Sequence, residues 1–172
     1  MNETSSNPAS APRPVFVLRP ADEADCVAIV GLIRELAEFE LLSHLVKVTP
    51  DGLRQHLFGE RPVAEAVVAE IDVGIVAFAL FFTNFSTFLG KPGLYLEDFS
   101  VQPDRRQQGI GKALLQHLGA LAVERGCGRF ERSVLDWNAD AIAFYRKMGA
   151  EVMPDWQICR IAGEALQSYA KG

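Results

Sequence analysis

The chain has 172 residues, of which 49% are hydrophobic and 23% are charged. This length favours one compact domain, and the composition excludes a disordered or fibrous chain. No apolar run reaches the roughly 20 residues that a membrane-spanning helix needs. The formal net charge of −5 disfavours nucleic acid and anionic membranes as partners, and it suits a cationic small molecule.

Three cysteines, Cys26, Cys127 and Cys159, lie far apart and outside any CxxC or Cys/His spacing. This pattern predicts neither disulfides nor a zinc site, so we expect a reduced, cytoplasmic protein without a metal. Residues 1–14 lack a basic start and an apolar centre, and we interpret them as a disordered tail and not as a signal peptide. The remaining residues, 15–172, are expected to form a single domain.

The start of the chain predicts a strand and two helices. A short strand over 15–19 ends at a proline, and apolar residues at helical spacing predict a helix over 25–40. Thr49 followed by Pro50 marks the start of a second, short helix, which Gly59 terminates.

The middle of the chain predicts three strands. The β-prone runs 64–71 and 75–82 flank a short turn, which predicts antiparallel pairing. A loop over 84–93 then leads to a strand over 94–101. This strand is mostly apolar but contains two adjacent carboxylates, and buried carboxylates need a reason.

The rest of the chain alternates helices and strands. The predicted elements are a helix over 109–125, a strand over 129–135, a helix over 139–148 capped by Asn138, a strand over 151–161 and a short C-terminal helix. This order predicts partly parallel pairing with helices on the sheet faces, and hence an α/β or α+β fold.

The segment from Val101 to Lys112 joins a strand to a helix N-terminus, where free N–H groups and the helix dipole favour an anion. Its glycines allow close approach of a ligand, and Arg105, Arg106 and Lys112 add positive charge. These features indicate a phosphate or pyrophosphate site. The alternative is an ordinary connection with solvated charges, and the segment fits neither the P-loop nor the dinucleotide-binding motif.

One motif in this segment, Arg106-Gln107-Gln108-Gly109-Ile110-Gly111, resembles the (Arg/Gln)-x-x-Gly-x-(Gly/Ala) pyrophosphate motif of the GNAT superfamily of N-acetyltransferases. Tyr95–Phe99 before it, and Trp137-Asn138 and Ala143–Ala150 after it, stand at the distances typical of that superfamily. Arg19-Pro20-Ala21, Glu35-Leu36-Ala37 and Phe39-Glu40 further resemble the spermidine/spermine (diamine) acetyltransferase branch. The resemblance covers about residues 15–170.

The resemblance implies a mixed sheet that is splayed between the strands at 94 and 129, with acetyl-CoA in the opening. It also implies a homodimer, with the chain from Glu151 onward as a candidate interface. The residues expected to bind acetyl-CoA are Phe99, Ser100, Val101, Arg106, Gln107, Gln108, Gly109, Ile110, Gly111, Lys112, Asn138, Ala139, Asp140, Ala141 and Tyr145. Asn138, Ile142 and Tyr145 are spaced to form one stripe of a helix.

The expected reaction is direct attack of a primary amine on the acetyl thioester. Because an alkyl amine has a pKa near 10.4, it must lose a proton first, and Glu97, if it is partly desolvated with a raised pKa, is the candidate base. Tyr145 is the candidate acid that protonates the departing thiolate. The structural alternatives are an ion-paired edge carboxylate for Glu97 and a core aromatic residue for Tyr145.

The acceptor is expected to be a small cationic amine, either a polyamine or a lysine-like compound. The candidate acceptor-binding residues are Phe39, Glu40, Glu97, Asp98, Glu131, Arg132 and Ser133. Phe39 stands where the branch often has Tyr, so the acceptor stays open, and each carboxylate has a solvated surface charge as its alternative. A non-catalytic CoA-binding module and a protein or peptide acetyltransferase are the competing hypotheses.

Overall fold

The computed structural model describes residues 15–72 and 74–171. The chain divides into a larger unit that ends at Ser133 and a smaller unit that begins at Val134. The tail predicted for residues 1–14 lies outside the described residues, and a single domain over 15–172 stays a prediction.

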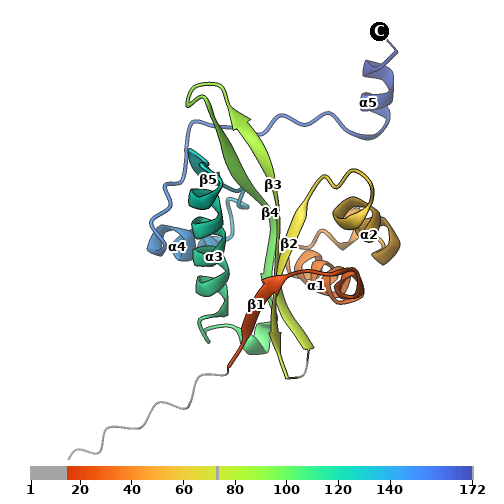
Figure 1. Ribbon diagram of the computed structural model, residues 1–172. Helices are drawn as coiled ribbons and strands as arrows, with labels where there is room; N and C mark the ends of the chain where they lie inside the picture. Colours follow the sequence, from red (N-terminus) through yellow and green to blue (C-terminus); the bar gives the residue numbers. More distant parts are fainter. Residues whose placement is uncertain (1–14, 73, 172) are drawn as a thin grey trace, which may run out of the picture. The chain divides into compact units, whose positions relative to one another are not determined.

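A five-stranded sheet forms the centre of the larger unit (Figure 1). Its strands, in spatial order, are β1 (Val17–Pro20), β2 (Glu65–Ile71), β3 (Gly74–Ser86), β4 (Lys91–Val101) and β5 (Arg129–Glu131). The first four pair antiparallel in succession, whereas β5 pairs parallel to β4. A parallel pair needs a long crossover, and here α3 (Ile110–Glu124) provides it.

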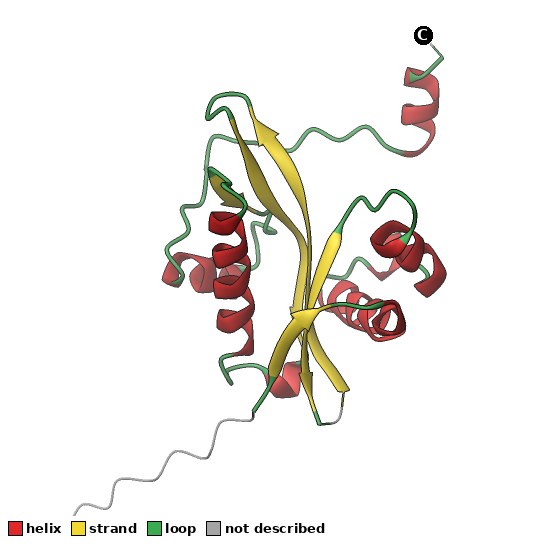
Figure 2. Ribbon diagram, in the orientation of Figure 1, coloured by secondary structure: helices red, strands yellow, loops and turns green. Residues whose placement is uncertain are grey.

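Helices cover both faces of this sheet, as Figure 2 shows. On one face, α1 (Cys26–Phe39) and α2 (Pro50–Phe58) share a core with Val68 and Phe78. On the other face, α3 packs against β2, β3 and β4, and one side of this helix is buried. The four consecutive residues from Ala66 to Ala69 are all buried, as expected for a strand covered on both sides. The predicted fold class is confirmed.

Short 3₁₀ turns complete the unit: η1 (Glu23–Asp25), η2 (Ser43–Leu45) and η3 (Pro103–Arg105). Helix α2 begins as predicted, because the Thr49 hydroxyl accepts a hydrogen bond from the Gly52 N–H at 3.1 Å. Such a cap satisfies one of the first N–H groups of the helix, which have no partner inside it.

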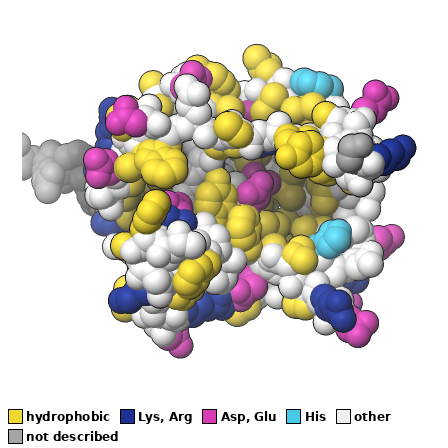
Figure 3. Space-filling view, turned by 90° about the horizontal axis from the view of Figure 1, so that it is seen from above, with side chains coloured by type: hydrophobic (Ala, Val, Ile, Leu, Met, Phe, Trp, Pro, Cys, Tyr) yellow, Lys and Arg dark blue, Asp and Glu magenta, His cyan; other side chains and the backbone are white. Residues whose placement is uncertain are grey.

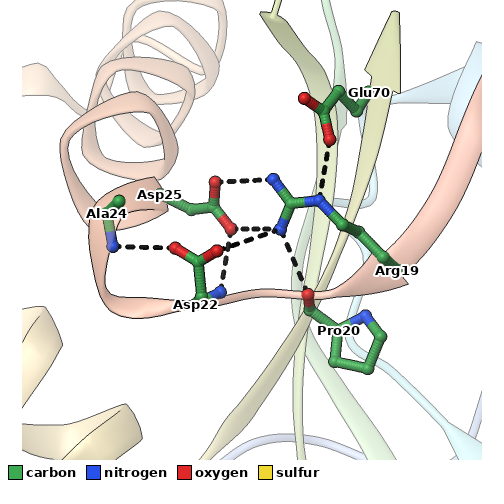
Figure 4. A network of polar contacts seen from close by, with 6 residues as sticks. All are labelled: Arg19, Pro20, Asp22, Ala24, Asp25 and Glu70. Atoms are coloured by element: carbon green, nitrogen blue, oxygen red, sulfur yellow. Dashed lines mark hydrogen bonds and ion pairs between the residues drawn. The ribbon is translucent and has the colours of Figure 1, made fainter.

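One arginine ties the first strand to its neighbours (Figure 4). The Arg19 guanidinium donates to both carboxylate oxygens of the buried Asp25, at 2.6 and 2.9 Å, and to Glu70 on β2 at 2.7 Å. The hydrogen bonds from Arg19 hold the pKa of Asp25 below its ordinary value, although burial opposes the shift. This network fixes the turn that leads from β1 into α1.

The hairpin of β3 and β4 is longer than the sequence predicts. The predicted loop over 84–93 is wrong, because β3 continues to Ser86 and β4 already begins at Lys91. Gly93, which suggests a loop in the sequence, lies inside β4, where a Cβ atom would contact the side chains of Asn84 and Arg129. Close packing across the sheet, and not a turn, therefore explains this glycine.

The smaller unit contains α4 (Ala139–Lys147) and α5 (Gly163–Tyr169). The predicted cap of α4 is confirmed: the Asn138 side chain accepts from the Ala141 N–H at 3.1 Å. The predicted strand over 151–161 is wrong, since this segment forms neither a strand nor a helix and nearly all of it is exposed. A β-prone segment makes a strand only when another strand pairs with it. The strand predicted over 129–135 likewise ends at Glu131, as β5.

Candidate active site

The loop before α3 presents backbone N–H groups that have no helical partner. Gly109 is the N-cap residue, with a φ of 91° and no side chain to cap the helix. The Ala113 N–H donates to the Gly109 carbonyl at 3.0 Å, so the N–H groups of residues 110–112 precede the first helical hydrogen bond. Gln107 also has a positive φ, of 62°. This backbone can bind an anion such as a pyrophosphate.

The positive side chains of this loop differ in their surroundings. Arg105 forms an ion pair with Asp104 at 3.3 Å, whereas Lys112 is exposed. The Arg106 Nε donates to the Val101 carbonyl at 3.0 Å, and its guanidinium carbon lies 5.5 Å from the centre of the Phe39 ring. Arg106 therefore joins the loop both to the end of β4 and to the end of α1.

Strand β4 extends past its pairing with β5. The parallel register runs only from Gly93–Arg129 to Tyr95–Glu131, but β4 continues to Val101. Beyond Tyr95, the β5 side of β4 has no paired strand among residues 15–72 and 74–171. This splay is the one that the resemblance implies, and the predicted donor-binding residues Phe99, Ser100 and Val101 lie on its open length.

A β-bulge explains why two carboxylates follow one another in β4. Opposite β3, Leu96 pairs with Phe81 and Asp98 pairs with Leu80, so Glu97 is the extra residue. A bulge bends the strand and redirects its side chains, and it often occurs next to active sites. Because Leu80 packs against the α1–α2 core, Asp98 lies on that face of the sheet.

The carboxylates near the bulge influence one another. Burial raises the pKa of Asp98, the negative charge of Glu97 raises it further, and the positive charge of Arg132 opposes both. Burial also raises the pKa of Glu40, the residue that ends α1, and there Asp98 adds to the shift while Arg132 opposes it. Three acids and one arginine thus share one electrostatic environment.

The more buried carboxyl is not the one that the sequence analysis favours. Glu97 is exposed, whereas the adjacent Asp98 is half-buried, and the role of Glu97 as the base stays a prediction. The bulge explains the exposure of Glu97, because it leaves this residue without a paired residue on β3. Figure 3 shows one face of the surface, where acidic side chains lie among hydrophobic ones and charges of both signs are interspersed.

The other predicted acceptor residues have partners around β5. The hydroxyl oxygens of Tyr95 and Ser133 lie 2.6 Å apart, and the Glu131 carboxylate forms an ion pair with Arg129 at 2.8 Å. The Arg132 Nε donates to the Ser133 carbonyl at 2.8 Å. Tyr95 is not among the residues that sequence reasoning selects for the site, although the segment that contains it carries part of the family resemblance.

Two further features are not predicted from the sequence. An open depression of about 540 Å³ lies beside the end of α1 and the turn after β4, and its lining residues are Glu35, Glu38, Phe39, Gln102, Pro103 and Asp104. The contact between Phe39 and Arg106 is the other, because a cation–π pair between distant residues has no local sequence signal. Phe39 is therefore already engaged by a cation of the chain itself.

In the smaller unit, α4 carries the remaining predicted residues. Asn138, with Ala139, Asp140 and Ala141, forms the capped start of this helix, and the Asn138 side chain is used in the cap. Tyr145 is buried, and its ring lies 5.4 Å from that of Phe144.

Neither a metal site nor a membrane span is found in the described part of the chain. No three His, Cys, Asp or Glu side chains there are grouped so that they could bind a metal ion. None of its helices is long and apolar enough to cross a bilayer.

Comparison with known proteins identifies the family. The sequence matches the Acetyltransferase (GNAT) family over residues 30–150. The chain belongs to the GNAT acetyltransferase family. A thialysine N-epsilon-acetyltransferase of Mus musculus is 39% identical over 164 residues, which cover 89% of this chain and 96% of the relative. The L-ornithine N5-acetyltransferase NATA1 of Arabidopsis thaliana is 34% identical, and the match covers 90% of this chain and 87% of that protein.

A solved structure agrees with this assignment at the level of the fold. An integron cassette protein from the mobile metagenome of V. cholerae aligns with a TM-score of 0.77 and 24% identity, over 91% of this GNAT chain and 98% of that one. This GNAT protein is accordingly an N-acetyltransferase that uses acetyl-CoA as its acyl donor. The N–H groups in the first turn of α3, which have no partner within the helix, and the open length of β4 suit a donor that carries a pyrophosphate and an amide-containing arm.

Proposed function

We propose that this N-acetyltransferase transfers the acetyl group to the primary amine of a small cationic acceptor. The observation that carries this proposal is the acidic cluster of Glu40, Glu97 and Asp98. Glu97 and Asp98 lie at the bulge of β4, and this strand continues into the loop before α3, which we call the donor loop (residues 102–109). Carboxylates attract an ammonium group, and they are well placed to bind it when they are partly desolvated.

The donor is proposed to bind along β4 and the loop before α3. The backbone of Phe99, Ser100 and Val101 would pair with its extended arm, and residues 107–112 would bind its pyrophosphate through N–H groups, with Arg106 at the start of the motif. Gly109 supports this assignment, because its positive φ and missing side chain leave the helix start open to an anion. The start of α4, Asn138–Ala141, is proposed as a further donor contact.

We propose different roles for the two candidate catalytic residues. Glu97 accepts a proton from the ammonium group of the acceptor, either directly or through water, and the neutral amine then attacks the thioester. The exposure of Glu97 leaves it accessible to such a water. Tyr145 donates its phenolic proton to the departing thiolate, because a tyrosine hydroxyl can act as a proton donor. Phe39, Glu131, Arg132 and Ser133 remain proposed neighbours of the acceptor.

Arg132 helps to narrow the acceptor class. Its positive charge acts on both Asp98 and Glu40, so the acceptor site combines carboxylates with a cation. An amino acid with a side-chain amine carries matching charges, because it has ammonium groups and a carboxylate. The relatives named above act on thialysine and on L-ornithine, which are both of this kind. We therefore favour a lysine-like or ornithine-like acceptor over a polyamine.

Pairs of amines that differ by one carboxylate test this assignment. Release of CoA is measured with ornithine against putrescine, with lysine against cadaverine, and with spermidine and a lysine-containing peptide. We expect turnover on the amino acids, with a kcat/KM at least about tenfold above that of the decarboxylated partner, and we expect Arg132→Gln to reduce this ratio. A higher kcat/KM for the diamines or spermidine would contradict the amino-acid assignment. Turnover on peptides alone would show a protein acetyltransferase, and binding of acetyl-CoA without turnover on any amine would show a non-catalytic module.

We also propose that the protein is a cytoplasmic homodimer. Support for the dimer comes from the segment after Glu151, whose large apolar side chains are each more than half exposed: Met153, Trp156, Ile158, Ile161 and Leu166. Apolar surface of this kind marks protein interfaces. Sedimentation velocity at micromolar concentration should give twice the chain mass, and Trp156→Glu should shift the protein toward the monomer. A monomeric wild type would contradict the proposal.

The proposed cytoplasmic location is supported by the free thiols of three cysteines, Cys26, Cys127 and Cys159, which suit a reducing compartment.

A further inference from the structure

Phe39 and Arg106 connect two parts of the enzyme that sequence reasoning assigns to different substrates. Phe39 ends α1 and precedes the acidic Glu40, whereas Arg106 opens the motif of the donor loop. In the structure the guanidinium carbon of Arg106 lies 5.5 Å from the centre of the Phe39 ring, within the range of a cation–π contact.

The second contact of Arg106 limits what this side chain can do. Its Nε donates to the carbonyl of Val101 at 3.0 Å, five residues earlier in the chain. One edge of the guanidinium is thus held by the end of β4, and one face lies over an aromatic ring. An arginine held from two directions has a restricted set of conformations, and so does the backbone that carries it.

The backbone next to Arg106 needs such support. Gln107 has a φ of 62°, which is costly for a residue with a side chain, and Gly109 follows with a φ of 91°. The N–H groups of residues 110–112 bind an anion well only if this strained turn is held in place before the ligand arrives. The two contacts of Arg106 supply this support from outside the loop.

We propose that Phe39 is a positioning residue of the donor site: its ring holds Arg106 and thereby fixes the loop that binds the pyrophosphate of acetyl-CoA. Phe39 acts through Arg106, and its main role is not contact with the amine. The same contact links the donor loop to the end of α1, where Glu40 lies. The proposal rests on the use of acetyl-CoA by this family and not on the identity of the acceptor.

Calorimetry with acetyl-CoA alone, without an amine, tests the proposal. Phe39→Leu keeps an apolar side chain but removes the ring, and we expect it to weaken acetyl-CoA binding by about two- to fivefold. Phe39→Tyr and Phe39→Trp keep an aromatic face and should restore the wild-type affinity. Phe88→Leu is the matched control, since Phe88 is 93% exposed in the turn between β3 and β4, and it should bind acetyl-CoA as the wild type does.

A double-mutant cycle with Arg106→Gln identifies the contact responsible. If Phe39 acts through Arg106, then Phe39→Leu should cause no further loss of acetyl-CoA affinity in a protein that already carries Arg106→Gln. Circular dichroism and urea unfolding verify that each variant is folded.

Three outcomes would overturn the inference: unchanged acetyl-CoA affinity in Phe39→Leu, additive losses in the double variant, or a raised KM for the amine alone. A wild type that binds acetyl-CoA but acetylates no amine would refute the proposed acceptor and leave this inference intact.

Discussion

The hydroxyl oxygens of Tyr95 and Ser133 lie 2.6 Å apart, and their hydrogen bond joins β4 to the chain just beyond β5. The backbone pairing of the two strands ends at Tyr95 and Glu131, so this side-chain contact lies at the point where the strands separate. It therefore acts as the last link between the strands before the sheet opens.

This link should contribute modestly to stability. Because the hydrogen bond is exposed, Tyr95→Phe and Ser133→Ala are each expected to lower the free energy of unfolding by about 0.5 kcal/mol. The double variant should lose no more than either single variant, because both changes break the same bond. Urea unfolding measures all three. Losses that add would show that the two hydroxyls act independently.

The network around Arg19 should matter more for stability. Arg19→Ala leaves the buried carboxylate of Asp25 without its charged partner, and we expect a loss of about 3 kcal/mol in the free energy of unfolding. Arg54→Ala is the control, since Arg54 pairs with the exposed Asp51 and Glu23 and should cost less than about 0.5 kcal/mol. Equal losses in the two variants would contradict the special role of Arg19.

The same network predicts a dependence of stability on pH. The folded protein binds a proton at Asp25 more weakly than the unfolded chain, because the hydrogen bonds from Arg19 lower the pKa of this carboxyl. The ionised carboxyl of Asp25 makes its full contribution to the free energy of unfolding above the ordinary aspartate pKa of about 3.9. This contribution disappears as the pH falls through the lower pKa of the folded state. Asp25→Asn should therefore be less stable than the wild type at pH 7, and the difference should shrink in acid. A difference that does not change with pH would argue against this explanation.

Asp98 should show the opposite effect on stability. Burial raises its pKa, so its charged form destabilises the fold once the pH exceeds that pKa. Asp98→Asn should raise the free energy of unfolding at pH 7 by about 0.5–1 kcal/mol and raise the KM of the amine by about tenfold. Glu97→Gln is the comparison: it should leave stability nearly unchanged and lower kcat, as expected for an exposed base. A lower free energy of unfolding in Asp98→Asn would contradict the explanation that the buried charge of Asp98 destabilises the fold.

Tyr145→Phe tests the proposed acid. Removal of the phenolic proton donor should lower kcat by about 100-fold, while the affinity for acetyl-CoA changes little. Tyr169→Phe is a matched control, because Tyr169 is exposed on α5 and should have wild-type kinetics. An unchanged kcat in Tyr145→Phe would eliminate this role.

Local sequence signals predict most of the helices well. Thr49 and Asn138 cap their helices as their positions suggest, and Gly109 leaves the start of α3 open. These features depend on a few neighbouring residues, which is why the sequence is sufficient. The loop before α3 carries a continuous motif, so its place between a strand and a helix N-terminus is predictable for the same reason.

Features that depend on distant partners are predicted less well. The segment 151–161 has β-prone residues but no strand beside it, and Gly93 suggests a loop although Asn84 and Arg129 pack over it within the sheet. The bulge at Glu97 is set by the register of β4 against β3, which a single strand does not reveal. As a result, the sequence reveals two adjacent carboxylates in β4 but does not reveal that Asp98 is the more buried of the two.

The extra residue at Glu97 also determines the direction in which Asp98 points. Tyr95 lies opposite Phe82 and Asp98 lies opposite Leu80, so the two residues share a face of the sheet although they are three positions apart. Without the extra residue, that spacing would place them on opposite faces. A relative whose strand has the same length but no bulge would therefore present this carboxyl on the other side of the sheet, and it is expected to differ in the amines it accepts.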